Sequence, residues 1–188
     1  VRLAGLTDWT TGFFPGTLWY GYELTGDKAL ADEAKKFTLA LDSIRNIKNT
    51  HDVGFMLYCS YGNAYRITGD KIYLPVLADG AANLYARFSP IVGTIRSWDF
   101  SWLHYPVIID NMMNLEYLYW SANQFKKPEY TNAANVHALT TIKNHFTQRT
   151  AVKNPALRLR SVTGIFQQNK SDSQMSRSYI FHPPNELF

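Results

Sequence analysis

A seven-residue pattern, Tyr-x-x-Thr-Gly-Asp-Lys, occurs at residues 22–28 and again 43 residues later at 65–71. In each copy the glycine suits the left-handed residue that ends a helix, and the aspartate suits the N-cap of the next helix. The repeated unit is therefore a pair of helices joined by a short turn. A chain built from such units is predicted to fold as an all-α protein.

The segment after each turn is predicted to be an outer helix with one apolar face. Apolar residues there recur at alternating spacings of four and three, and most charged residues lie off that stripe. The stripes consist of Leu30, Ala34, Phe37, Leu41 and Ile44 after the first turn, and of Leu77, Ala81, Leu84 and Phe88 after the second.

Residues 53–67 and 111–125 are apolar or aromatic on nearly all sides, which predicts inner helices that are buried on most faces. A third pair is completed by residues 126–146, where Pro128 suits a helix start and Leu139, Ile142 and Phe146 form a stripe. Alternating inner and outer helices predict an α/α barrel or toroid, of which three hairpins make about half. Residues 89–106 are predicted to be a long, partly extended loop.

Asp52 and Asp110 each precede a predicted inner helix. Inner helices that run the same way place their N-terminal ends at one end of a ring, so we expect the two carboxylates to share one cavity mouth. Either aspartate alone is explained by N-capping, worth about 1 kcal/mol. A pair is different, because a helix N-terminus lowers a carboxylate pKa and a second carboxylate raises one of the two. One protonated and one ionised aspartate suit general acid/base chemistry.

Three further residues near these aspartates are candidates for binding a ligand. His51 is either a donor to an anionic ligand or a histidine that merely starts a helix. Trp9 and Trp98 either stack on a sugar ring or pack in the core.

Composition excludes several classes of function. The net charge is +4, but residues 1–150 hold 14 basic and 13 acidic residues, so most of the excess positive charge lies in residues 151–188. The chain has no basic stripe with interleaved aromatics, so we predict no nucleic-acid partner. It also has no long apolar run and no leader sequence, so we predict no membrane partner and assign no compartment. The single cysteine, Cys59, excludes an internal disulfide and a CxxC metal site, and we predict neither a metal nor a cofactor.

Four segments, "DWTTGFFPGTLWYGYELTGD", "HDVGF", "RSWDF" and "VIIDNMMNLEYLYW", together resemble glycoside hydrolase family 88, the unsaturated glucuronyl hydrolases, over about residues 7–146. The resemblance implies an (α/α)6 barrel that removes the unsaturated uronic acid from the non-reducing end of lyase-generated oligosaccharides. It also implies a bacterial enzyme of the cytoplasm or periplasm that uses no cofactor.

The same resemblance implies roles for individual residues. Asp110 matches the aspartate that protonates C4 of the vinyl ether and activates the water that adds at C5. Asp52 matches the aspartate that assists, and Trp9, His51 and Trp98 match positions that line the sugar site.

The chain also departs from the family pattern. A preceding helical segment is absent, and so is the second half, with its Tyr-His pair and its Arg-Gly-Gln-Ala-Trp segment. We therefore expect residues 1–146 to form a partial barrel catalytic domain. Residues 147–188 form a divergent basic tail, interpreted as frame-shifted or disordered. The uncovered inner helices of such an arc favour oligomerisation or aggregation.

Three other functions compete with this prediction. An unsaturated rhamnogalacturonyl hydrolase shares the barrel and the reaction. A non-catalytic sugar-binding or inactive fragment is favoured by the absent half of the site. An α/α-barrel epimerase is disfavoured, because no histidine pair is placed for two-base proton exchange.

Overall fold

The computed structural model describes residues 5–100, 103–145, 165–167 and 178–180. The helices are α1 (Phe13–Thr25), α2 (Lys28–Leu39), α3 (Val53–Leu57), α4 (Asn63–Thr68), α5 (Leu74–Tyr85), α6 (Leu115–Phe125) and α7 (Pro128–His145). Short 3-10 segments are η1 (Asp42–Asn46), η3 (Lys71–Tyr73) and η4 (Ile109–Asn114), and η2 (Tyr58–Gly62) is a π-helical turn. Most of the predicted tail lies outside the described residues.

Two short antiparallel hairpins accompany the helices. In the first, β1 (Phe88–Ser89) pairs with β2 (Thr94–Ile95), in the segment predicted to be partly extended. In the second, β3 (Ile165–Gln167) pairs with β4 (Ser178–Ile180).

Both Thr-Gly-Asp turns have the geometry that the repeat predicts. Gly26 and Gly69 adopt left-handed φ angles of 70° and 68° at the C-caps of α1 and α4. A carboxylate oxygen of Asp27 accepts the N–H of Ala29 at 2.9 Å, and Asp70 does the same for the residue two positions on at 3.1 Å. The prediction of helical hairpins is therefore confirmed.

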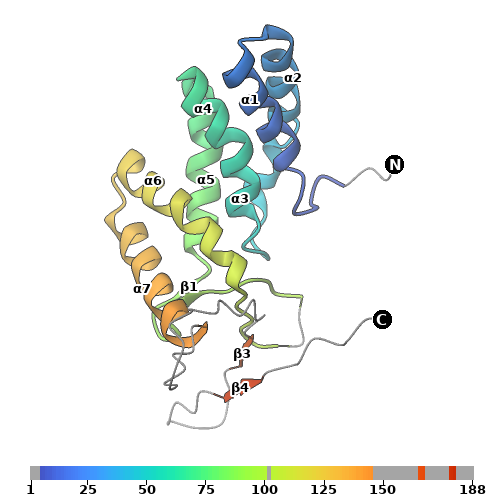
Figure 1. Ribbon diagram of the computed structural model, residues 1–188. Helices are drawn as coiled ribbons and strands as arrows, with labels where there is room; N and C mark the ends of the chain where they lie inside the picture. Colours follow the sequence, from blue (N-terminus) through green and yellow to red (C-terminus); the bar gives the residue numbers. More distant parts are fainter. Residues whose placement is uncertain (1–4, 101–102, 146–164, 168–177, 181–188) are drawn as a thin grey trace, which may run out of the picture.

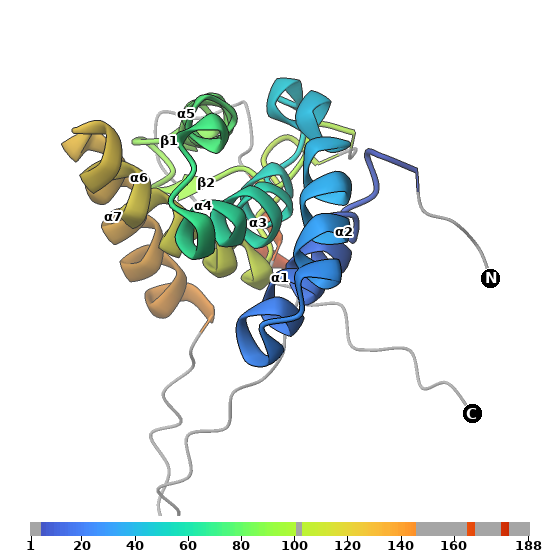
Figure 2. The same cartoon turned by 90° about the horizontal axis from the view of Figure 1, so that it is seen from above.

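Three helical hairpins form an arc, with α1, the continuous α3–η2–α4 helix and α6 as inner elements and α2, α5 and α7 as outer ones (Figure 1). Seen from above, the hairpins fan out side by side from α2 to α7 (Figure 2). The inner helices α3 and α6 run the same way, so their N-terminal ends lie at the same end of the arc. This arrangement brings the segments before the two helices together.

Glycine allows α1 to pack closely on the neighbouring inner helix. A Cβ added to Gly12 would lie 2.2 Å from the carbonyl oxygen of Met56, and one on Gly16 would lie 2.8 Å from that of Cys59. On the side of α2, Trp19 of α1 is almost fully buried and donates its indole N–H to Thr38 Oγ1 at 2.9 Å.

The apolar stripe predicted for the last helix is wrong. Leu139 and Ile142 are 67% and 52% exposed, and Phe146 lies outside the described residues. The buried face of α7 consists of Tyr130, Ala133, Ala134, His137 and Thr141. Small and polar side chains suit this face because α7 packs against α6 and β2, and His137 accepts a hydrogen bond from the β2 backbone.

No helix among the described residues is long and apolar enough to cross a membrane.

Candidate active site

The two aspartates lie at helix starts that are in direct contact. Asp52 precedes α3, and Asp110 is the second residue of η4, which leads into α6. The two segments pack closely because Gly54 of α3 has no side chain. A Cβ there would lie 2.0 Å from Oδ1 of Asn114, the last residue of η4.

His51 lies between the two carboxylates. Its ring is fully buried, and its Nε2 is 3.1 Å from Oδ1 of Asp52 and 3.8 Å from Oδ1 of Asp110. The side chains of Asp52 and Asp110 are 21% and 38% exposed. The structure therefore places both carboxylates around one imidazole, at the end of the arc where α3 and η4 begin.

N-capping does not explain either aspartate in this structure. Asp52 occupies the N-cap position of α3, yet its side chain makes no capping hydrogen bond. Its Oδ2 instead accepts the hydroxyl of Thr50 at 2.8 Å. Asp110 lies within η4, whose N-cap is Ile108. The carboxylate of Asp52 is therefore held by Thr50 and not by the backbone of its own helix start.

The surroundings of Asp110 favour its protonated form. Desolvation by burial raises the pKa of this carboxyl above its ordinary value, and the negative charge of Asp52 raises it further, whereas His51 lowers it. Oδ1 of Asp110 is buried and has no hydrogen-bond partner among the described residues. A carboxyl group with a raised pKa is suited to donate a proton near neutral pH.

Within the described residues, these same three side chains also form a group that could hold a metal ion. One nitrogen of His51 and one oxygen from each of Asp52 and Asp110 lie within 4.8 Å of one another. Two carboxylates and an imidazole are acceptable ligands for several divalent ions.

Aromatic side chains extend from His51 in two directions. Phe55 lies 6.3 Å from the His51 ring and 6.4 Å from the ring of Trp9, between ring centroids. On the other side, the Trp98 ring lies 6.0 Å from His51 and stacks on Phe100. Trp9 is 54% exposed and Trp98 is half-buried, so neither is a fully buried core residue. Exposed aromatic faces beside carboxylates are suited to bind sugar rings.

No protein-family model matches the chain. It is 43% identical over 143 residues to the unsaturated glucuronyl hydrolase of Formosa agariphila, a match that covers 74% of this chain and 36% of the relative. It is 34% identical over 143 residues to the unsaturated chondroitin disaccharide hydrolase of Streptococcus agalactiae, covering 73% and 36%. The crystal structure of an unsaturated glucuronyl hydrolase specific for heparin matches with a TM-score of 0.82 and 63% identity, covering 90% of this chain and 43% of that one. The chain belongs to the unsaturated glucuronyl hydrolase family.

Unsaturated glucuronyl hydrolases are (α/α)6 barrels, so the arc of three hairpins corresponds to about 40% of the family fold. The chain spans about 36% of the length of the curated relatives it matches. The fold prediction of a partial (α/α)6 barrel is confirmed. The roles assigned to Asp52, Asp110, Trp9, His51 and Trp98 stay predictions.

Sequence reasoning missed a buried polar network behind the group formed by His51, Asp52 and Asp110. Asn111 donates its amide N–H to the carbonyl of Ile95 at 2.6 Å, and Asn114 donates to Oδ1 of Asn111 at 3.0 Å. Nδ1 of His137 accepts the N–H of Ile95 at 2.9 Å. The available signal was a pair of asparagines three residues apart in an otherwise apolar helix start, because buried amides need partners.

Proposed function

We propose that this chain supplies the acid-bearing part of a glycoside hydrolase that releases an unsaturated uronic acid from the non-reducing end of an oligosaccharide. The observation that carries the proposal is the contact of His51 with both Asp52 and Asp110, beside the exposed Trp9 and the half-buried Trp98. The names of the relatives support the same chemistry and do not favour the rhamnogalacturonyl alternative.

In the proposed reaction, Asp110 donates its proton to C4 of the C4=C5 double bond. Its carboxylate then takes a proton from a water molecule, whose hydroxide bonds to C5. The resulting hemiketal opens by breaking the bond between C5 and the ring oxygen. This leaves a hemiacetal at the anomeric carbon, which releases the neighbouring sugar as an alcohol. One water is consumed, and the catalytic aspartate ends in its protonated form.

The environment of each group suits its role. The raised pKa of Asp110 favours the protonated form, from which C4 would take its proton. Asp52, hydrogen-bonded by Thr50, disfavours a second negative charge on Asp110. His51 has no exposed surface, which favours a role in holding the two carboxylates over direct contact with the sugar. Trp9 and Trp98 supply the stacking faces.

We further propose that heparin-derived disaccharides are the substrates to test first. The solved relative with 63% identity is described as specific for heparin. The relative from Streptococcus agalactiae, at 34% identity, is a chondroitin disaccharide hydrolase. Substrate preference in the completed protein is therefore expected to follow the more similar relative.

The test follows the ultraviolet absorbance of the conjugated C4=C5 bond with unsaturated heparin and chondroitin disaccharides. Two proteins are compared: this chain, and a chimaera in which the chain replaces the corresponding residues of the heparin-specific relative. Asp110→Asn in the chimaera is expected to lower turnover by on the order of 10² to 10⁴. Asp32→Asn, an exposed change on α2, is the charge-matched control.

Loss of absorbance in the chimaera that depends on Asp110 supports the proposal. A chimaera that binds the disaccharides without consuming them contradicts it and supports the sugar-binding alternative. An Asp110→Asn chimaera as active as the parent would also overturn the assignment of the acid.

A further inference from the structure

The segments that carry His51 and Trp98 are joined through their backbones. The N–H of His51 donates to the carbonyl of Ser97 at 2.6 Å, and the N–H of Asp99 donates to the carbonyl of Asn49 at 2.9 Å. Thr50 and Trp98 form an isolated antiparallel bridge between these bonds. Residues 48–52 and 96–99 lie outside the helices, so the position of Trp98 relative to His51 depends on this junction.

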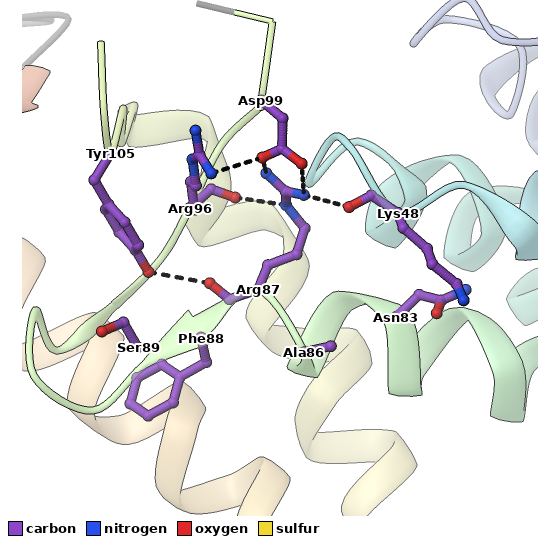
Figure 3. A pocket seen from close by; sticks show the side chains of 9 residues that line it. All are labelled: Lys48, Asn83, Ala86, Arg87, Phe88, Ser89, Arg96, Asp99 and Tyr105. Atoms are coloured by element: carbon purple, nitrogen blue, oxygen red, sulfur yellow. Dashed lines mark hydrogen bonds and ion pairs between the residues drawn. The ribbon is translucent and has the colours of Figure 1, made fainter.

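A buried arginine lies behind the junction and contacts both of its segments. The Arg87 side chain is 5% exposed. Its Nε donates to the carbonyl of Arg96 at 2.8 Å, its Nη1 donates to the carbonyl of Lys48, and its Nη2 donates to Oδ1 of Asp99 at 2.9 Å. Figure 3 shows these contacts converging on one guanidinium at the edge of a pocket of about 450 Å³.

We propose that Arg87 is a positioning residue that fixes the Trp98 face at its distance from the His51, Asp52 and Asp110 group. The sugar-binding role of that face rests on the proposed function. The junction itself is a property of the described structure.

Guanidinium chemistry explains why an arginine occupies this position. Its planar fork presents several N–H donors in fixed directions, so one side chain reaches two carbonyls and a carboxylate at once. A lysine offers one flexible ammonium and does not span three separated acceptors. Asp99 is 43% exposed and is also contacted by Arg96 at 3.1 Å, so it stays solvated when Arg87 is changed.

The chain contains a matched control pair away from the site. Arg66 of α4 donates to both carboxylate oxygens of Glu23 of α1, at 2.6 and 2.9 Å. This pair lies near the C-terminal ends of the inner helices, opposite the end where Asp52 and Asp110 meet (Figure 1). Arg87→Lys and Asp99→Asn are therefore compared with Arg66→Lys and Glu23→Gln.

The first readout is hydrogen exchange measured by mass spectrometry on the full 188-residue chain. Arg87→Lys is expected to speed exchange about tenfold in the peptides over residues 48–52 and 94–99 together, because the junction bonds open more often. The control variants are expected to leave those peptides unchanged. Unchanged exchange in Arg87→Lys, or faster exchange in only one of the two segments, overturns the proposal.

The second readout separates positioning from general stability in the chimaera with the heparin-specific relative. Arg87→Lys is expected to raise KM about tenfold or more with a smaller fall in kcat, since a displaced Trp98 weakens sugar binding. A melting temperature that drops while KM stays within about twofold of the parent contradicts the positioning role. If the unsubstituted chimaera turns over no substrate, the proposed function fails, whereas the exchange result still decides whether Arg87 fixes the junction.

Discussion

Gly54 of α3 lies directly against the side chain of Asn114, and this contact sets the separation of the two aspartate-bearing segments. Asn114 is fully buried and is held by its hydrogen bond to Asn111, so it has little freedom to move aside. The distance between Asp52 and Asp110 is therefore governed by a residue that has no side chain.

Gly54→Ala is expected to destabilise the protein by about 2 kcal/mol, the usual cost of overpacking a buried contact. In the chimaera with the heparin-specific relative, the activity is expected to fall by a larger factor than the fraction of folded protein, because the two carboxylates move apart. Chemical denaturation and kinetics of the same preparations measure both effects.

Gly21→Ala is the matched control for that change, since its added Cβ meets only the flexible end of Leu30 at 3.1 Å. Alanine is favoured over glycine within a helix by about 1 kcal/mol, so this variant is expected to keep or gain stability. Equal losses in both variants would contradict the role of the Gly54 contact.

His137 is expected to make the protein sensitive to acid. Burial lowers the pKa of this histidine to about 4, with smaller contributions from His51 and His145. Its folded pKa is thus below the unfolded value near 6.5, so the unfolded state takes up the proton first as the pH falls. The stability it contributes is complete above about pH 6.5 and is lost toward pH 4, by about 3 kcal/mol.

The His137→Asn variant tests this expectation, because an asparagine oxygen is able to accept the N–H of Ile95 without titrating. Denaturant unfolding of both proteins between pH 7 and pH 4 is expected to show a shallower decline in the variant. Parallel declines would show that another group is responsible for the acid sensitivity.

Asp110→Asn is expected to raise the melting temperature at neutral pH even though it removes the proposed acid. The pKa of Asp110 is raised in the folded state, chiefly by burial, so its charged form opposes folding. The stability it contributes is complete below its unfolded pKa and is lost as the pH rises through the folded value. The asparagine of the variant has the same shape but does not ionise, so the variant does not lose this stability as the pH rises. A lower melting temperature for the variant across this pH range contradicts the expectation.

The dependence of kcat/KM on pH in the chimaera is expected to shift when Asp52 is neutralised. The negative charge of Asp52 raises the pKa of Asp110, so Asp52→Asn lowers it. The limb of the rate profile where activity falls with rising pH is expected to move to lower pH. A plot of log kcat/KM against pH for parent and variant measures the displacement, and a limb that moves upward or stays fixed rejects the coupling.

Helical repeats and turns were predictable because their signals are local. Gly26 and Asp27 carry the geometry of the turn in their own backbone and side-chain preferences. Apolar periodicity located the outer helix over Leu77, Ala81 and Leu84, all of which are buried. The same reasoning failed for Leu139 and Ile142, because the neighbours of α7 decide which of its faces is covered.

The candidate site was only partly predictable for the same reason. The sequence placed Asp52 and Asp110 before inner helices, and parallel inner helices imply that their starts meet. Sequence did not indicate that His51 is buried between the carboxylates, nor that capping is absent from both aspartates. Arg87 and His137 carried no local signal that set them apart as partners of the site.

By itself, the amino-acid sequence determined the hairpin repeat, the turns and the residues brought toward one end of the arc, since these depend on local backbone preferences and on the period of a helix. Only the tertiary structure decided the distances between His51 and the two carboxylates, the close approach of Gly54 to Asn114 and the contacts of Arg87. Those features join residues far apart in the chain, and burial and charge act through space rather than along the sequence.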